Sequence, residues 1–400
     1  MDVDLAAALG ERVRFARQQR HQTQAVVAGL AGITTDYLYQ IERGKKLPTL
    51  PIVLQLARVL RVSVSDLLGD PRPAERPIAP LEAGTAIHRA LTQPLTGDDG
   101  VAVDTLHSEI RAAWRTWQGA PQRYTRLAGQ LPALITATER LRRTTDGIPS
   151  RARDAQRCAV DLYGLVRSVA KRVGRVDLAL LAADRGVASA EAAGNPVRLA
   201  SARWNLVHVL LAQGQPVEAE AVARHATEAL DGVVGDDLDA LALQGSLRLL
   251  AAVANVRQGK AWAARDQVRS VIPLAARTGE RNVCWTAFGP TNVAMYAVSV
   301  EVEAGDTSEG LRLAEGIEPK PSLSIERRVA FHLEQAKGYN QRQDYAGALV
   351  MLQAASVEAP EDIKYRPAAR AALNIVVQRA RGQVARHAAS LATRVGVPVG

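Results

Sequence analysis

Polar residues on one side of a short predicted helix are the first candidates for chemistry in this chain. Over 35–42, Leu38 and Ile41 lie three residues apart and point inward. The residues that then point outward are Thr35, Asp36, Tyr39 and Gln40. A glutamine can bond adenine through two hydrogen bonds, and a threonine can contact the methyl group of thymine. Asp36 is less usual beside a polyanion, so it either accepts from cytosine N4 or orients its neighbours.

A tight turn joins this polar helix to a shorter helix before it. Thr23 is a good N-cap for a helix over 24–30, and Thr34 is one for the polar helix. Gly32 lies between the two helices and is free to take the positive φ of a turn. These residues predict a helix-turn-helix.

A cationic loop follows the polar helix. Gly44 ends the helix and Pro48 prevents its continuation, with Lys45 and Lys46 between them. A helix-turn-helix with a polar second helix and a cationic exit is suited to the major groove of DNA. An ordinary helical hairpin, such as half of a repeat, is the alternative interpretation.

Amphipathic helices on both sides complete a domain. A helix over 9–19 precedes the pair and a helix over 50–60 follows it, each with apolar residues on one side. A last short turn ends at Gly69. Residues 1–69 therefore predict one compact domain of five helices.

The order and spacing of these residues resemble the phage-repressor/Cro (Xre-type) DNA-binding domain. The residues that carry the resemblance are Thr23-Gln24, Ala28, Gly32, Tyr37-Leu38, Ile41 to Lys46, Pro48, Leu56 to Leu60, Val64 and Asp66 to Leu68. The resemblance implies that Thr35, Asp36 and Gln40 face base edges. It also implies a set of phosphate contacts, namely Gln24, Tyr37, Arg43, Lys45 and Lys46. Thr34 and Tyr39 complete the expected DNA-binding surface.

The resemblance also implies a structural ion pair. In that family an arginine of the first helix makes a buried ion pair with the glutamate that closes the recognition helix. Arg17 and Glu42 hold these two positions here. One buried charge without the other is costly, so the pair is expected to stabilise the domain.

Length and composition set the broad class. A chain of 400 residues predicts two or three domains, and its 4% aromatic content predicts a core of mostly Ala, Leu and Val. The formal net charge of +9 fits polyanion partners, but an arginine-rich composition also follows from GC-rich coding. The sequence has no segment suited to crossing a bilayer and no signal peptide, so we expect a cytoplasmic protein without membrane contact.

A proline-rich segment separates the first domain from the rest. Four prolines lie within 70–80, which predicts an extended linker over 70–100. From residue 101 to residue 400 the pattern is helix after helix. A glycine followed five residues later by Ala or Gly recurs at Gly174, Gly214, Gly259 and Gly305. Helical hairpins repeated on this scale are typical of an α-solenoid, and we expect seven of them.

One hairpin closely resembles a tetratricopeptide repeat. Its small, tyrosine, small, large, small and proline positions are Ala336, Tyr339, Ala348, Leu352, Ala355 and Pro360. The other hairpins match only at the glycine and the small residues, so we expect tetratricopeptide-like units with longer helices and irregular loops.

Signatures of catalysis and metal binding are not found in the sequence. There is no glycine-rich phosphate loop, no HExxH motif and no nucleophile motif, and the seven histidines are scattered. Cys158 and Cys284 are too few for a disulfide framework or a zinc site. We therefore expect no enzyme activity, no metal and no cofactor.

A second candidate site lies on the expected concave face of the repeats. The candidates are Trp204 and His208 in one hairpin, with Trp285, Phe288, Asn292 and Met295 in another. Because aromatic residues are rare in this chain, their presence on first helices is a signal, and a ligand site is one interpretation of it. The alternative is that they fill the core between repeats. Gly289-Pro290 interrupts this region and predicts a bent helix that opens a pocket.

Together these features predict an all-α transcription regulator, in which an Xre-type helix-turn-helix domain precedes a tetratricopeptide-like α-solenoid. Its layout resembles bacterial Xre–tetratricopeptide regulators, including peptide-responsive and actinobacterial ones. The expected partners are double-stranded operator DNA, a small-molecule or peptide effector, and a second copy held through apolar residues of 365–395. An effector would change the superhelical pitch, since each repeat would touch only its neighbours. The alternative is a protein-interaction scaffold with a vestigial DNA-binding head.

Overall fold

The computed structural model describes residues 2–19, 22–60, 62, 64, 67, 79–93, 101–144, 149–235, 237–318 and 323–397. Within these ranges the chain is helical, apart from turns, loops and one isolated antiparallel bridge between Arg281 and Phe288. The expected all-α fold is confirmed. The chain divides into two compact units, Met1–Ile78, here called the head, and Ala79–Gly400, here called the helical unit. No helix in the described ranges is long and apolar enough to cross a membrane.

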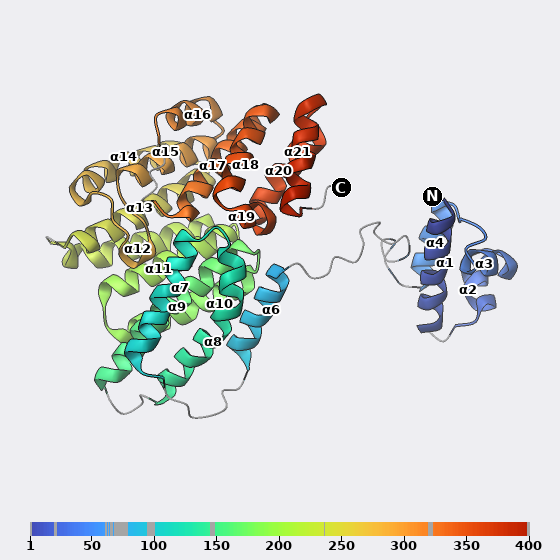
Figure 1. Cartoon of the computed structure of the whole chain (residues 1–400), viewed down its shortest axis with the longest axis horizontal. Coiled ribbons are helices and arrows are strands. Elements are labelled where there is room, and N and C mark those ends of the chain that lie inside the picture. The colour runs from blue at the N-terminus through green and yellow to red at the C-terminus, as the bar shows by residue number, and fades with distance from the viewer. Residues whose placement is uncertain are drawn as a thin grey trace. The chain divides into compact units, whose positions relative to one another are not determined.

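The head contains α1 (Asp2–Gln19), α2 (Gln24–Leu30), α3 (Thr35–Glu42) and α4 (Leu50–Leu60) (Figure 1). Both predicted N-caps are formed, because Thr23 Oγ1 accepts from the backbone N–H of Val26 and Thr34 Oγ1 from that of Tyr37. Gly32 takes the expected positive φ, 65°, in the turn between α2 and α3. The predicted fifth helix, which ends before Gly69, lies mostly outside the described residues.

The core of the head joins the four helices that the structure describes there. Its buried side chains include Leu9, Val13, Val27, Leu38, Ile41, Leu56 and Leu60. Helix α1 approaches α3 closely at Gly10, where a Cβ atom would clash with the backbone carbonyl oxygen of Ile41. The polar face of α3 is therefore held on a packed scaffold.

The expected ion pair between Arg17 and Glu42 connects α1 to the end of α3. Arg17 donates from Nε and Nη2 to the two carboxylate oxygens of Glu42 at 2.6 and 2.9 Å. The side chains are only 12% and 3% exposed. The hydrogen bond to Glu42 raises the pKa of Arg17 above its ordinary value. Gln24 at the start of α2 donates to Glu42 Oε2 at 2.7 Å, so one carboxylate ties three helices together.

The helical unit is a chain of antiparallel hairpins. Its helices are α6 (Ala79–Thr92), α7 (Val103–Gly119), α8 (Arg123–Thr144), α9 (Pro149–Arg172), α10 (Val176–Ala193), α11 (Pro196–Ala212), α12 (Pro216–Val234), α13 (Leu238–Arg257), α14 (Ala261–Thr278), η1 (Val283–Trp285, a single 3-10 turn), α15 (Pro290–Ala304), α16 (Thr307–Glu315), α17 (Ile325–Gln341), α18 (Tyr345–Glu358), α19 (Pro360–Tyr365), α20 (Pro367–Arg379) and α21 (Gly382–Val395). In the described part of the chain, the hairpins are α7/α8, α9/α10, α11/α12, α13/α14, α15/α16, α17/α18 and α20/α21. This matches the expected seven.

The recurring glycines lie where the first helix of a hairpin turns into the second. Gly174, Gly214, Gly259 and Gly305 have φ values of 83°, 72°, 78° and 87°. This left-handed conformation costs a residue with a Cβ atom about 1 kcal/mol or more, which explains the recurrence of glycine. Gln343 fills the corresponding position of the α17/α18 hairpin and takes the same conformation, with φ at 59°.

The structure corrects the predicted linker. Part of 70–100 forms α6, whose Ile87 and Leu91 are buried and which packs on α8. We predicted extended chain from the prolines, but four of them lie before residue 81, and a stretch rich in Ala and Leu follows. The helical unit therefore begins at Ala79 and not at residue 101. Residues 70–78 and 94–100 lie outside the described residues.

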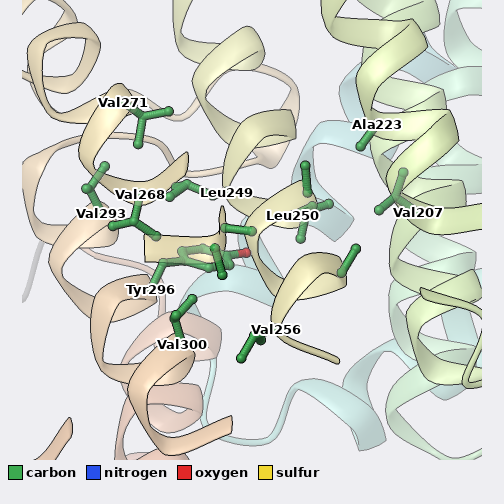
Figure 2. Packing of buried hydrophobic residues seen from close by; sticks show 14 of the residues in the cluster. Val207, Ala223, Leu249, Leu250, Val256, Val268, Val271, Val293, Tyr296 and Val300 are labelled. Atoms are coloured by element: carbon green, nitrogen blue, oxygen red, sulfur yellow. The ribbon is translucent and has the colours of Figure 1, made fainter. Parts of the chain in front are cut away.

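One large buried cluster surrounds α13. Leu249 and Leu250 of α13 meet Val268 and Val271 of α14 and Val293 of α15 (Figure 2). Small side chains let neighbouring helices approach, and the larger aliphatic ones fill the space between them. This is the Ala-, Leu- and Val-rich core expected from the composition.

Buried polar contacts join the first hairpin to the far end of the helical unit. Arg123 at the start of α8 donates to Asp362 of α19 at 2.6 Å, and both side chains are 0% exposed. The Tyr124 hydroxyl donates to the other oxygen of Asp362 at 3.1 Å. Trp117 of α7 donates to Glu326 of α17 at 2.9 Å. The expectation that each hairpin touches only its neighbours is therefore wrong, because the array closes on itself.

The C-terminal hairpin also differs from expectation. We expected apolar residues of 365–395 to be left uncovered and to form a dimer interface. Leu373 and Val376 of α20 and Leu391 of α21 are instead buried in one cluster with residues of α17 and α18. Helix α21 covers α20, so these residues are not available to a second copy.

The closure predicts a large loss of stability when one charge is removed. Asp362→Ala leaves Arg123 buried without its carboxylate, so the free energy of unfolding of the helical unit should fall by about 3–5 kcal/mol. Arg123→Met combined with Asp362→Asn removes both charges, keeps an acceptor for Tyr124, and should cost much less. Urea unfolding followed by circular dichroism measures both. Asp154→Ala, which breaks an exposed pair with Arg157, is the control and should cost less than about 1 kcal/mol.

The head allows the same comparison at its own ion pair. Glu42→Ala should destabilise the head by about 3–5 kcal/mol, because Arg17 then stays buried without a partner. Replacing both residues with apolar ones should cost much less. Thermal unfolding of the single and double variants measures the difference. Equal losses in the two variants would show that the pair is not what holds α1 to α3.

Candidate DNA-binding surface and ligand cavity

The outward face of α3 carries the residues predicted to read DNA. Thr34, Thr35, Asp36 and Tyr39 are exposed, and Gln40 is half-buried. Gln40 Nε2 donates to Oδ2 of Asp36 at 2.7 Å, one helical turn away. Of the two roles left open for Asp36, this bond favours the orientation of Gln40.

The cations that follow α3 lie against its tyrosines. The guanidinium carbon of Arg43 is 5.6 Å from the ring centre of Tyr39, and Lys46 Nζ is 5.6 Å from that of Tyr37. Lys45 is exposed. These cation–π contacts restrict two flexible side chains at the surface next to the polar face. The arrangement can place positive charge along a phosphate backbone.

An open groove beside α3 is lined in part by Arg14, which the sequence analysis missed. Arg14, Gln24, Tyr39 and Arg43 are among the residues that line it. One amide N–H of Gln24 is used by Glu42, and a side-chain amide has two N–H groups. Arg14 is exposed on α1, one turn before Arg17. Arg14 precedes Arg17 by three residues, which places both on one side of α1, and this spacing could have identified Arg14 in the sequence.

A small cavity inside the helical unit brings together three of the six predicted ligand residues. Trp204, His208 and Trp285 line it, together with Trp114 of α7, which the sequence analysis did not select. We call it the tryptophan cavity. Its volume is about 30 Å³, which holds roughly one water molecule. Trp114 and Trp285 stack with ring centres 5.1 Å apart and planes 7° apart.

The other three predicted ligand residues lie in the core. Phe288 is 0% exposed and fits against Gly245 of α13, where a Cβ atom would clash with its ring. Asn292 is 2% exposed and donates to the backbone carbonyl oxygen of Ala287. Met295 is 3% exposed and belongs to a separate apolar cluster. For these residues the alternative interpretation, a role in the core, describes the structure.

A loop carries Trp285 to the cavity. Residues 281–288, here called the strap, connect α14 to α15 and begin and end with paired backbone hydrogen bonds between Arg281 and Phe288. Asn282 Nδ2 donates to Gln118 Oε1 of α7 at 2.7 Å, which holds the strap against the first hairpin. The predicted bent helix is therefore absent from this described segment, and α15 begins cleanly at Pro290.

The strap has an unusual backbone. Cys284, Trp285 and Ala287 have φ values of 46°, 64° and 51°. The left-handed region costs non-glycine residues about 1–3 kcal/mol each, and such residues gather at ligand sites and switches. The surrounding contacts must therefore hold the strap in place.

Several cations surround the cavity. Arg167, Lys171 and Arg172 project from α9, and Arg327 lies at the start of α17. Their signal in the sequence was the Arg167–Lys171 spacing of four, which places both on one side of a helix. Burial and the charge of Lys171 hold the pKa of His208 well below its ordinary value, so His208 is neutral near pH 7.

Glu326 is the carboxylate on the cavity wall. It accepts from Nε and Nη2 of Arg172 at 3.0 and 2.7 Å and from Trp117. Burial alone would raise the pKa of Glu326, but the charges of Arg172 and Arg123 hold it well below the usual range. Both carboxylate oxygens are thus engaged in the closure of the array.

Comparison with known proteins concerns mainly the head. Residues 8–68 match the family model of the helix-turn-helix domain. The uncharacterized HTH-type transcriptional regulator YazB of Bacillus subtilis (strain 168) is 38% identical over 58 residues, which make up 14% of this chain and 84% of that protein.

Solved structures of two regulators are similar at low identity. PlcR of Bacillus thuringiensis, in complex with the peptide PapR7 and DNA, is 12% identical, with 86% of this chain and 99% of that chain covered and a TM-score of 0.31. The apo form of the competence regulator ComR from Streptococcus vestibularis is 12% identical, with 98% and 100% covered and a TM-score of 0.25. With TM-scores this low, the family is assigned from the head alone. The head matches the helix-turn-helix domain model and YazB, so the chain belongs to the family of helix-turn-helix transcriptional regulators.

Proposed function

We propose that this regulator reads operator DNA with the outward face of α3 and that a small molecule or peptide bound in the tryptophan cavity controls its affinity for that DNA. Two copies would bind one palindromic operator. The proposal rests on two separate features, the polar surface of α3 and the cavity beneath the strap.

The DNA part is supported by the geometry of α3. Gln40 is held by Asp36 in a defined orientation, and a fixed amide discriminates bases better than a mobile one. Arg43, Lys45 and Lys46 follow directly and supply positive charge for phosphates. A single head of this kind reads only a short site, which is why the proposal includes a second copy at a spacing of about 34 Å, one helical turn.

The effector part is supported by the tryptophan cavity. Side chains from α7, α9, α11, the strap and α17 meet there, although they are far apart in the sequence. A volume of about 30 Å³ admits no effector larger than water, so a ligand must displace the strap. The left-handed residues of the strap make the closed state costly, and this lowers the free energy needed to open it.

Control of DNA binding requires that the ligand bind the state with the strap open more tightly than the state with the strap closed. A ligand that binds both states equally does not shift the equilibrium between them. The strap contacts α7 through Trp114 and Gln118, and α7 forms a hairpin with α8, on which α6 packs. Helix α6 is the first described element after the head. We infer that strap opening acts through this hairpin, in place of a change in superhelical pitch.

The DNA surface is tested by two substitutions with different signatures. Gln40→Ala should weaken binding to the preferred operator by about 1–3 kcal/mol and relax one base position. Lys45→Ala should weaken all sequences alike and reduce the salt slope by about one. Selection of binding sites from random DNA, followed by titrations at several salt concentrations, measures both. If Gln40→Ala kept the same preferred operator, α3 would not be the reading helix, and a lack of any sequence preference would favour a scaffold.

Control by the cavity is tested at the strap. Trp285→Ala removes the stack on Trp114, so it should shift operator affinity by about fivefold or more, the usual range of coupling between sites. Trp262→Ala is the matched control, because Trp262 is 74% exposed on α14 and does not line the cavity. Fluorescence anisotropy with labelled operator measures the affinity, and light scattering on the same samples gives the mass. Equal affinities for the Trp285 and Trp262 variants would remove the proposed control.

A further inference from the structure

The wall of the tryptophan cavity carries more positive than negative charge. Its cations are Arg167, Lys171, Arg172 and Arg327, and its carboxylate is Glu326. Arg172 binds Glu326 with two hydrogen bonds, so that pair is neutral as a unit. In the part of the chain that the structure describes, Arg167, Lys171 and Arg327 form no ion pair. Buried charge without a partner is costly, so this imbalance requires an explanation.

Three other partly buried arginines of the helical unit have carboxylate partners. Arg265 binds Glu301 through two hydrogen bonds at 2.8 and 2.5 Å, and Arg328 binds Glu358 at 2.7–3.0 Å. Arg198 binds Asp161 at 2.6 Å. These three arginines thus have their own carboxylates, whereas the single carboxylate of the cavity wall, Glu326, is already bonded to Arg172.

Arg167 is built into the wall. Its side chain lies over the ring of Trp204, with Cζ 5.3 Å from the ring centre, and Nη2 donates to Oδ1 of Asn205. Asn205 fits closely against Gly164 of α9, where a Cβ atom would come within 3.1 Å of its amide nitrogen. Arg167 is 3% exposed, and its Nε–H has no hydrogen-bond partner. A positioned donor without an acceptor thus lies at the cavity.

Arg327 and Lys171 add donors to the same wall. The buried Nε–H of Arg327 also has no hydrogen-bond partner, and its guanidinium lies over the ring of Tyr296. Lys171 Nζ lies 3.3 Å from Nδ1 of His208, which is neutral. These three groups offer N–H donors, and none of them is a negatively charged hydrogen-bond acceptor. Such a set of donors is typical of a site that binds an oxyanion.

We propose that the ligand of the tryptophan cavity is a small organic anion, whose carboxylate or phosphate is held by Arg167, Lys171 and Arg327 and whose apolar part replaces Trp285 against Trp114. This inference rests on the proposed function of the cavity as the effector site. The anion supplies the charge that the wall lacks, and its remainder occupies the space that the strap vacates. A neutral ligand would leave the donors unpaired, and a cation would add to the repulsion.

Proton linkage gives this site a signature. Burial, followed by the charges of Arg172 and Arg167, holds the pKa of Lys171 well below its ordinary value. The charged or titratable groups that face Lys171 are Arg167 and Arg172 on its own helix, His208 on α11, Glu326 and Arg327 on α17, and Arg366 after α19. A bound anion favours the protonated lysine, so the pKa of Lys171 rises, and at a pH where part of the free Lys171 is neutral the binding takes up a proton. Affinity for an anion should therefore fall as the pH rises.

The test uses probes of one shape and different charge on the full chain. Benzoate, benzamide and benzamidinium carry charges of about −1, 0 and +1 near pH 7, and phenyl phosphate tests the second oxyanion. Binding is followed by tryptophan fluorescence and by the shift in thermal midpoint, at constant ionic strength. We expect benzoate or phenyl phosphate to bind at least about tenfold more tightly than benzamide, with no binding of benzamidinium. The stronger of the two anions identifies the head group.

Two variants locate the binding. Arg167→Met should abolish the preference for benzoate over benzamide and should itself raise the thermal midpoint, because a buried unpaired charge is removed. Lys171→Met should remove the pH dependence of benzoate binding between pH 6 and pH 9, a range in which benzoate stays ionised. Arg224→Met is the control, since Arg224 is 65% exposed on α12 and pairs with Glu228. It should bind the probes as the unmodified protein does.

Separate outcomes judge the inference and the proposed function. Benzamide binding as tightly as benzoate, or benzoate binding unchanged in both cavity variants, would overturn the anion site, as would no binding of any probe. A neutral compound that displaces Trp285 and shifts operator affinity would also overturn it, while the proposed control of DNA binding would stand. If Arg167→Met lost anion binding, but an anion bound to the unmodified protein left operator affinity unchanged, the anion site would be supported. The proposed control of DNA binding would then be overturned.

Discussion

The buried contact of Arg123 and Tyr124 with Asp362 is the constraint on which the helical unit depends. It joins residues 239 positions apart and turns an array of hairpins into a closed structure. Closure places the inner side chains of α7, α9 and α17 against one another, so that their charges leave water. The low pKa of His208, the depressed pKa of Lys171 and the pairing of Glu326 with Arg172 all follow from that burial.

The sequence predicted those features that are determined by residues close together in the chain. The caps at Thr23 and Thr34, the turn at Gly32 and the glycines between paired helices each follow from backbone stereochemistry, which acts within a few residues. Arg17 and Glu42 are 25 residues apart and were found only through a family resemblance. Arg123 and Asp362 had neither a motif nor proximity in the chain, so nothing in the sequence indicated that the array closes.

Three of the six predicted ligand residues line the tryptophan cavity and three lie in the core, for a physical reason. Helical register places a residue on a face, but it does not show whether a neighbouring element covers that face. Phe288 is covered because Gly245 leaves room for its ring in the core. Trp285, three residues earlier, lies in a left-handed stretch that no propensity rule favours, and its position depends on Trp114 and Gln118. Long-range contacts of this kind also left Arg167 and Lys171 unrecognised.

Closure changes how an effector could act on DNA binding. In an open solenoid a small rotation between repeats accumulates along the array, and pitch can vary continuously. A closed array resists such rotation, because the contacts of Arg123 and Trp117 would have to break. The proposed movement of the strap does not require those contacts to break, because the strap is tied to α7 by one stack and two side-chain hydrogen bonds. Its strained backbone and the unpaired charges beneath it both favour release when an anion is present, which makes the proposed control a two-state opening at one loop.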